Sequence, residues 1–304
     1  MYLKYYLEKL EYEKMPYFMA KYLYLSSIIR LKKVGYFCGM DYASKDIYRF
    51  REKITRYDHS VTTALLTYKL TNDKKATLAA LFHDIATPCF SHVIDYMNKD
   101  YDKQESTEKL HNKMLLKDKK LMYLLSQDNL KIEDIIDFKS FHVVDNDRPK
   151  LCADRLDGII LTGIGWTKDI EKADIDNIIN DVILLKNENN EDEIGFMNYN
   201  VANKVINVSK TIDLYCHSLE DNYMMELLAK ITRYAILKKY ISYNDLYYYD
   251  EEKLFGILDS KNDNILNKYL KEFRTKKKTE IKEFDNPKVK NRSLTPLVNG
   301  KRIK

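Results

Sequence analysis

The sequence contains little glycine or proline, few cysteines and no long apolar run. Only 8 glycines and 5 prolines occur in 304 residues, so strong signals that end a helix are rare. Cysteine occurs four times without a CxxC pair, which excludes a short-domain disulfide framework and predicts free thiols in a reducing compartment. No segment approaches the roughly 18 apolar residues that span a bilayer, and the charged N-terminus lacks a signal-peptide pattern. We therefore expect a cytoplasmic protein that does not bind a membrane.

The net charge of +5 is distributed unevenly along the chain. Residues 271–304 contain twelve lysines or arginines and four acidic residues, a net charge of +8, so residues 1–270 carry −3. Such a basic tail predicts contact with nucleic acid or with nucleotide phosphates. A solvated charged face or a frayed chain end has the same composition, so this alternative stays open.

The hydrophobic residues follow a helical period and do not alternate over several strands. Apolar positions recur at helical spacing in residues 60–72, 151–163 and 221–240. Residues 76–86 are apolar on almost every side, which is typical of a central buried helix, and Pro88 should end it.

Only two short stretches, residues 195–202 and 292–298, favour a small β-element. The sequence therefore predicts an all-α protein. We expect a helical bundle over residues 1–240 and a smaller C-terminal region over residues 241–304, which combines helix with the basic tail.

Two histidines and two aspartates stand within these apolar helices. His83 and Asp84 are adjacent in the buried helix, and His59 lies 24 residues earlier, a spacing that suits two antiparallel helices joined by a short turn. Asp154 lies on an apolar helix face, where a carboxylate is costly to bury without a cation. Nitrogen and oxygen ligands in this mixture suit Mn, Fe, Ni, Co or Zn, and Mg if more oxygens join. The order H…HD…D thus predicts one divalent metal ion.

Five segments carry a resemblance to a known family, and together they cover roughly residues 20–165. They are "RLKKVG" (30–35), "RYDHS" (56–60), "HDIATPCFSHVID" (83–95), "QES" (104–106) and "ADRLDGIILT" (153–162). The chain resembles the HD-domain metal-dependent phosphohydrolases, in particular the dGTPase-like branch of deoxynucleoside triphosphate triphosphohydrolases and its uncharacterised bacterial relatives.

The resemblance implies an HD-type helical bundle with His59, His83, Asp84 and Asp154 as metal ligands. When bound, the ion would polarise a phosphoryl oxygen and lower the pKa of a water molecule. Asp84 would also act in catalysis by orienting the attacking water.

Further roles follow from the same resemblance. Arg56 matches an arginine close to substrate phosphate, a role that suits its planar guanidinium. His92 and Asp95 match residues that approach the phosphates, so we expect Asp95 to bind substrate and His92 to act as the general acid.

The chain departs from the family pattern at several positions. Thr87 and Gln104 replace histidines, and Gly158 and Thr162 replace the tyrosine and aspartate that help to recognise the sugar. We therefore expect weak discrimination between ribose and deoxyribose. Glu105 beside Gln104 is a catalytic candidate, either as a base or as a partner of a ligand histidine.

Two more residues are candidates for substrate binding. Lys150 precedes the Asp154 helix and could meet phosphate, although "DNDRPK" is first a polar turn. Asp157, one turn after Asp154, could contact substrate or support a ligand.

Three functions remain open from the sequence. The leading one is metal-dependent hydrolysis of a nucleotide phosphate ester, with a (deoxy)nucleoside triphosphate as the expected substrate. The alternatives are a phosphodiesterase or 5'-nucleotidase on the same scaffold, and a non-catalytic HD module that binds nucleotide or nucleic acid. The lost histidines favour the module, and the complete ligand set favours an enzyme. We also expect a homo-oligomer.

Overall fold

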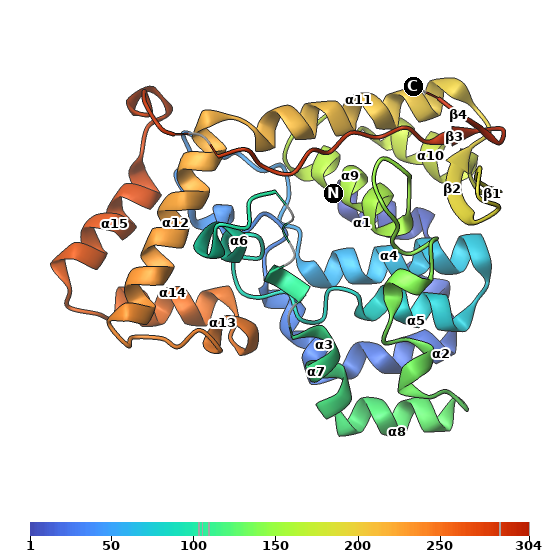
Figure 1. Ribbon diagram of the computed structural model, residues 1–304, viewed down its shortest axis with the longest axis horizontal. Coiled ribbons are helices and arrows are strands. Elements are labelled where there is room, and N and C mark those ends of the chain that lie inside the picture. Colours follow the sequence, from blue (N-terminus) through green and yellow to red (C-terminus); the bar gives the residue numbers. More distant parts are fainter. Residues whose placement is uncertain (103, 105, 109, 286, 304) are drawn as a thin grey trace.

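The computed structural model describes residues 1–102, 104, 106–108, 110–285 and 287–303. The α-helices are α1 Tyr2–Lys9, α2 Tyr17–Ala20, α3 Ser26–Arg30, α4 Arg56–Thr71, α5 Lys74–Phe82, α6 Val93–Asn98, α7 His111–Lys117, α8 Lys119–Gln127, α9 Ala153–Gly165, α10 Lys172–Asp181, α11 Tyr199–Cys216, α12 Leu219–Leu237, α13 Asp245–Tyr248, α14 Glu251–Asp259 and α15 Asn264–Thr275. The strands are β1 Val182–Lys186, β2 Asp192–Phe196, β3 Leu297–Val298 and β4 Lys301–Arg302. Helices thus dominate the described chain and one small sheet accompanies them, which confirms the predicted fold class (Figure 1).

Single turns of 3-10 helix connect several of these elements. They are Tyr12–Lys14, Lys21–Tyr24, Leu31–Lys33, Met40–Tyr42, Ser106–Glu108, Ile132–Asp134, Phe138–Ser140 and Lys278–Glu280. None of the helices in the described parts of the chain combines the length and the apolar character needed to cross a bilayer.

Helices α4 and α5 form a hairpin that extends from the middle of the molecule to its right-hand side in Figure 1. Thr55 and Asp58 form a capping box, in which each side chain accepts a hydrogen bond from the backbone N–H of the other, and this fixes the start of α4. Asn72 ends α4 in the left-handed conformation, at φ 51°, and the carboxylate of Asp73 then caps α5. Because the connection is so short, the two helices are antiparallel neighbours, as the sequence predicts.

Helix α5 ends at Phe82, so the prediction that it continues to residue 86 is wrong. The N–H of Ile85 donates to the carbonyl of Phe82, and the N–H of Thr87 donates to that of Asp84, which are hydrogen bonds of tight turns. Pro88 explains the change, because it lacks an N–H, would clash with a carbonyl four residues earlier and disfavours helical backbone at Thr87. The His83–Asp84 pair therefore lies in a turn at the end of α5.

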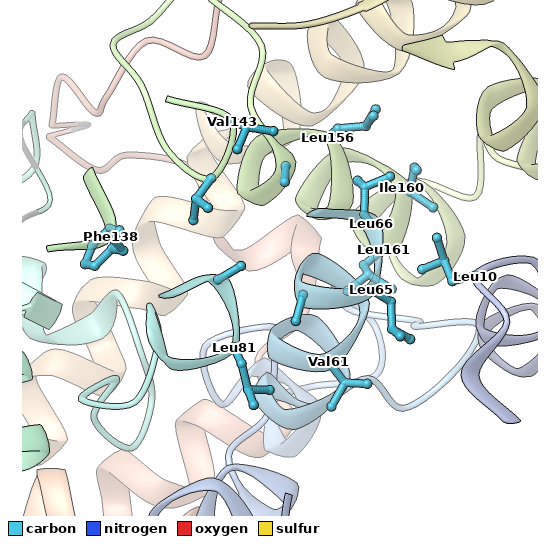
Figure 2. Packing of buried hydrophobic residues seen from close by; sticks show 14 of the residues in the cluster. Leu10, Val61, Leu65, Leu66, Leu81, Phe138, Val143, Leu156, Ile160 and Leu161 are labelled. Carbon is cyan, nitrogen blue, oxygen red and sulfur yellow. The ribbon is translucent and has the colours of Figure 1, made fainter. Parts of the chain in front are cut away.

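Helix α9 packs against α4 through apolar side chains. Leu65 and Leu66 of α4 lie beside Ile160 and Leu161 of α9, and all four are at most 3% exposed (Figure 2). Each such buried side chain contributes about 1.5–3 kcal/mol relative to an exposed one. This packing holds the first turn of α9, which carries Asp154, next to the first turn of α4, which carries His59.

A second apolar cluster lies among α6, α12, α14 and α15. Its members include Ile94, Leu228, Leu254 and Phe273, each at most 1% exposed. The domain boundary that the sequence places near residue 240 stays a prediction. Helix α12, before this boundary, packs both on α6 and on α15, which lie on either side of it in the sequence.

The sheet joins distant parts of the chain. β1 pairs antiparallel with β2, β2 pairs parallel with β3, and β3 pairs antiparallel with β4. The parallel register sets Gly195 opposite Leu297 and Phe196 opposite Val298, so the predicted β-element is correct for these residues. Residues 199–202 instead begin α11. The pairing anchors the end of the basic tail beside α10 and α11 (Figure 1).

Candidate metal centre

Three elements bring the predicted ligands to one place. His59 lies in the first turn of α4, and Asp154 lies in the first turn of α9. His83 and Asp84 lie in the turn that follows α5. Both histidines are buried, with residue exposures of 2% for His59 and 7% for His83.

The donor atoms of three of these side chains converge. The Nε2 atoms of His59 and His83 are 3.2 Å apart. Oδ1 of Asp154 lies 2.9 Å from Nε2 of His59 and 3.5 Å from Nε2 of His83. All three donor atoms lie within 4.8 Å of one another, so these side chains could hold a metal ion.

The hydrogen bonds on the far side of each ring decide which nitrogen is free. Nδ1 of His59 lies 2.7 Å from Oδ2 of Asp157, and Nδ1 of His83 lies 2.7 Å from the carbonyl of Ala80. Carboxylate and carbonyl oxygens only accept, so each Nδ1 carries the proton of a neutral imidazole and each Nε2 presents a lone pair. Two lone pairs and a carboxylate oxygen then face one another, an arrangement that a proton on Nε2 or a metal ion between the donors stabilises. The donor set fits a divalent ion.

The pKa values of these groups reflect the same convergence. Burial alone would lower the pKa of His59, but its hydrogen bonds to Asp154 and Asp157 outweigh burial and raise that pKa to about 10. Burial raises the pKa of the Asp154 carboxyl, but the hydrogen bonds from His59 and His83 hold it well below its usual range. Protons and a metal ion therefore compete for the same lone pairs.

Asp84 lies at the edge of this group. Its Oδ2 atom accepts from Nη1 of Arg56 at 2.8 Å and is 4.0 Å from Nε2 of His59. Its Oδ1 atom accepts from the hydroxyl of Thr87 at 2.9 Å. Burial opposes ionisation, yet Arg56 and His83 hold the pKa of Asp84 below its usual range. Its roles as a ligand and as the group that orients water stay predictions.

Asp157 is not among the residues that line the cavity. It is fully buried, and its carboxylate accepts from the hydroxyls of Tyr6 and Thr62, at 2.7 and 2.9 Å, as well as from His59. All of these partners are protein groups, which favours the expected support of a ligand, and the alternative of a substrate contact stays a prediction. The structure makes Asp157 the residue that orients His59.

Asp95 also lies behind a histidine rather than in the cavity. It is fully buried, accepts from Nδ1 of His92 at 2.9 Å and accepts from the N–H of Ser106 at 3.1 Å. The predicted contact of Asp95 with substrate stays a prediction. His92, whose side chain is 32% exposed, lines the cavity and is held in place by this buried carboxylate.

Lys150 points away from the site. Its Nζ atom pairs with Oε2 of Glu191 at 3.0 Å, and it is not among the residues that line the cavity. Glu191, in the connection between β1 and β2, is thus the ion partner of Lys150, and the contact of Lys150 with phosphate stays a prediction. Glu105, the predicted catalytic glutamate, lies outside the described residues, so its role stays a prediction.

A cavity of about 310 Å³ opens beside the converging ligands. His59, His83, Asp84 and Asp154 line it together with Arg56, His92 and Gln104. Two further groups of side chains lie in its wall, and none of their residues was a predicted site residue. The aromatic group includes Tyr36, Phe37, Tyr48, Phe50 and Trp166. The basic group includes Arg148, Arg155, Lys290 and Arg292.

The aromatic group forms a continuous wall from the metal centre. The ring of Tyr36 lies 5.1 Å from that of His59, and Phe37 stacks on Phe50 at 4.3 Å between ring centroids. Trp166 follows at 6.3 Å from Phe50. Only the position of Tyr36, directly after "RLKKVG", gave a signal in the sequence.

Gly158 leaves space that Tyr36 uses. A Cβ atom at position 158 would lie 2.9 Å from the hydroxyl oxygen of Tyr36, and the guanidinium of Arg56 lies 4.8 Å from the centroid of the Tyr36 ring. Tyr36, from the N-terminal part of the chain, thus places a phenol beside position 158, and weak discrimination between ribose and deoxyribose stays a prediction.

Comparison with known proteins identifies the central part of the chain. Residues 56–159 match the family model of the HD domain. The chain is 25% identical over 215 residues to the uncharacterized protein YdhJ of Bacillus subtilis, an alignment that covers 70% of this chain and 64% of YdhJ. It is 29% identical over 117 residues to the metal-dependent phosphohydrolase cns2 of Cordyceps militaris, covering 38% of this chain and 33% of that protein. The chain thus spans less than two thirds of each relative.

Asp157 gives a test of the metal centre. The Asp157→Asn change removes the charge that orients His59, so affinity for Mn²⁺ or Co²⁺ should fall by about 10–100-fold. Competition with a chelating indicator measures this, and the exposed Asp285→Asn variant is the matched control. Equal affinity in both variants, with unchanged folding by circular dichroism, would contradict the assigned role.

Proposed function

We propose that the HD domain of residues 56–159 makes this chain a metal-dependent phosphohydrolase that acts on a phosphate ester of a nucleotide. One observation carries the proposal: two imidazole lone pairs and a carboxylate converge at the wall of a cavity that basic and aromatic side chains also line. The cavity volume of about 310 Å³ lies at the lower end of the range for small-molecule sites.

His59, His83 and Asp154 would hold the ion, with Asp84 beside them. When bound, the ion supplies Lewis acidity to a phosphoryl oxygen and lowers the pKa of a water molecule. The HD domain and the name of the fungal relative support this chemistry.

Arg56 is prepared to bind a phosphate oxygen. Its Nη1 donates to Asp84 at 2.8 Å and its Nε donates to the Ser91 hydroxyl at 3.1 Å, while its guanidinium lies over the ring of Tyr36. These contacts fix the plane of the guanidinium before a ligand arrives. Since guanidinium groups bind phosphate through paired hydrogen bonds, this order favours recognition.

His92 and Asp95 supply proton transfer. The buried Asp95 accepts from Nδ1 of His92, so Nε2 is the nitrogen that exchanges a proton on the cavity side. This pairing of an imidazole with a buried carboxylate is the usual way to orient a general acid or base. It favours an enzyme over a non-catalytic binding module.

The departures from the family pattern do not disrupt the site. Thr87 donates to Asp84, and Gln104 accepts from Arg292, so both replacements take part in the hydrogen bonds of the cavity wall. The resemblance to deoxynucleoside triphosphate triphosphohydrolases and the aromatic wall together favour a nucleotide. A phosphodiesterase or 5'-nucleotidase would use the same residues, and the assay below distinguishes them.

The His92→Ala variant tests the assignment of roles. Loss of the proton donor should lower turnover by about 10²–10⁴-fold, while metal content stays unchanged because the converging donor atoms do not include His92. His142→Ala is the control, since His142 faces Glu191 with a side chain that is 40% exposed. Turnover equal to wild type in His92→Ala would assign proton transfer to another group.

A substrate panel tests the proposed activity itself. The purified chain, loaded in turn with Mn²⁺, Fe²⁺, Co²⁺, Ni²⁺, Zn²⁺ and Mg²⁺, should hydrolyse at least one nucleotide among GTP, the dNTPs, nucleoside monophosphates and a phosphodiester. We expect a ratio of GTP to dGTP hydrolysis below about 10³-fold, because Thr162 gives no carboxylate to bind a sugar hydroxyl. If no combination of metal ion and substrate gave hydrolysis, the result would support the non-catalytic binding module instead.

A further inference from the structure

The basic tail does not extend away from the molecule. Residues 287–296 run alongside α11, as the red segment of Figure 1 shows, and β3 follows them into the sheet. Val289, Leu294 and Leu297 are buried along this path. We call residues 287–296 the strap.

Hydrogen bonds fasten the strap to three parts of the fold. The N–H of Lys290 donates to the carbonyl of Tyr101 at 3.0 Å. The N–H of Arg292 donates to Oδ1 of Asp213 on α11 at 2.9 Å, and the N–H of Thr295 donates to the carbonyl of Pro149 at 3.0 Å. The strap thus bridges α11 and the loops that follow α6 and precede α9.

The strap forms part of the cavity wall. Val289, Lys290 and Arg292 line the cavity that His59, His83 and Asp154 also line. Arg148, from the loop before α9, lines it as well, and its Nη1 donates to the carbonyl of Ser293 on the strap.

Arg148 and Arg292, two of the four arginines that line the cavity, differ in their partners from Arg274 and Arg302 of the tail. Neither Arg148 nor Arg292 forms an ion pair with any residue that the structure describes, whereas the tail residues Arg274 and Arg302 pair with Asp259 and Glu193 at 2.8 Å. Arg274 and Arg302 thus form ion pairs away from the cavity, whereas the Arg292 guanidinium donates to the Gln104 amide and to the Lys290 carbonyl in the cavity wall.

Positive charges affect the pKa values of Lys290 and Arg148, whereas Asp213 and Asp221 are among the groups that raise the pKa of Arg292 against the effect of burial. Burial lowers the pKa of Lys290, and the nearby charges of Arg148 and Arg292 lower it further, with Asp145 opposing them. Burial, Arg155 and Arg292 lower the pKa of Arg148 to about 10. A phosphate group bound between these side chains would add favourable interactions with all three positive charges.

We propose that Lys290 and Arg292 of the strap form, with Arg148, a second oxyanion site in the cavity, which binds a phosphate group of the ligand other than the one at the metal centre. The assignment rests on the proposed function for its place in a reaction, but binding at the site is independent of hydrolysis. The tail then serves recognition of the small ligand rather than of a nucleic acid.

Inorganic tripolyphosphate is the probe, titrated calorimetrically into the full chain after metal has been removed by chelation and dialysis. Wild type should bind it, and Lys290→Gln and Arg148→Gln should each lose at least about tenfold in affinity, as expected for charged hydrogen bonds. Lys288→Gln is the matched control, because Lys288 is on the same strap, exposed and outside the cavity wall. Lys290→Arg keeps the charge and should retain binding, and melting temperatures identify any variant that fails to fold.

Several results would overturn the second site. They are absence of tripolyphosphate binding to wild type, equal affinity in Lys290→Gln and wild type, and equal weakening by Lys288→Gln and Lys290→Gln. The last result would mean diffuse attraction to the tail, as a nucleic-acid surface would show. Failure of the hydrolysis assay would leave this binding result intact, so the two proposals are judged separately.

Discussion

The metal centre depends on the Nδ1 protons of two imidazole rings, each of which is held in a hydrogen bond. His59 and His83 each use Nδ1–H in a hydrogen bond to a fixed acceptor, Asp157 and the carbonyl of Ala80. Their Nε2 lone pairs must then meet 3.2 Å apart beside the carboxylate of Asp154, a geometry that neutral imidazoles cannot satisfy among themselves. A proton on Nε2 of His59 or a metal ion between the three donors resolves the conflict, and the two compete for the same position. The capping of α4, the turn after α5 and the packing of α9 on α4 all serve to hold these three donors together.

The same device occurs twice in the cavity wall. A fully buried aspartate stands behind an imidazole, Asp157 behind His59 and Asp95 behind His92. One of these histidines is poised to bind an ion, and the other is partly exposed to the cavity. Buried carboxylates are costly unless their oxygens are hydrogen-bonded, and here hydroxyl, backbone and imidazole groups satisfy them. At both positions the buried carboxylate fixes the orientation of a functional imidazole ring.

The sequence predicted those features of the fold and the site that depend on a local pattern of residues. The helical period located α4, α9 and α12, and the H…HD…D order located the side chains that converge. It could not tell which aspartates face the cavity, because Asp154 and Asp157 lie one turn apart on the same face of α9, and only tertiary packing buries the second completely. The path of the strap could not be predicted from the sequence either. The hydrogen bond from the N–H of Lys290 to the carbonyl of Tyr101 joins parts of the chain that no local pattern relates. Composition revealed the charge of the tail but not its path.

The central claim is that His59, His83 and Asp154 hold one divalent ion. Anomalous diffraction from crystals of the full chain loaded with Zn²⁺ tests it most directly. The account predicts one strong peak at about 2.0–2.2 Å from Nε2 of both histidines and from a carboxylate oxygen of Asp154. A peak bound elsewhere, with the two Nε2 atoms still in contact with each other, would contradict it.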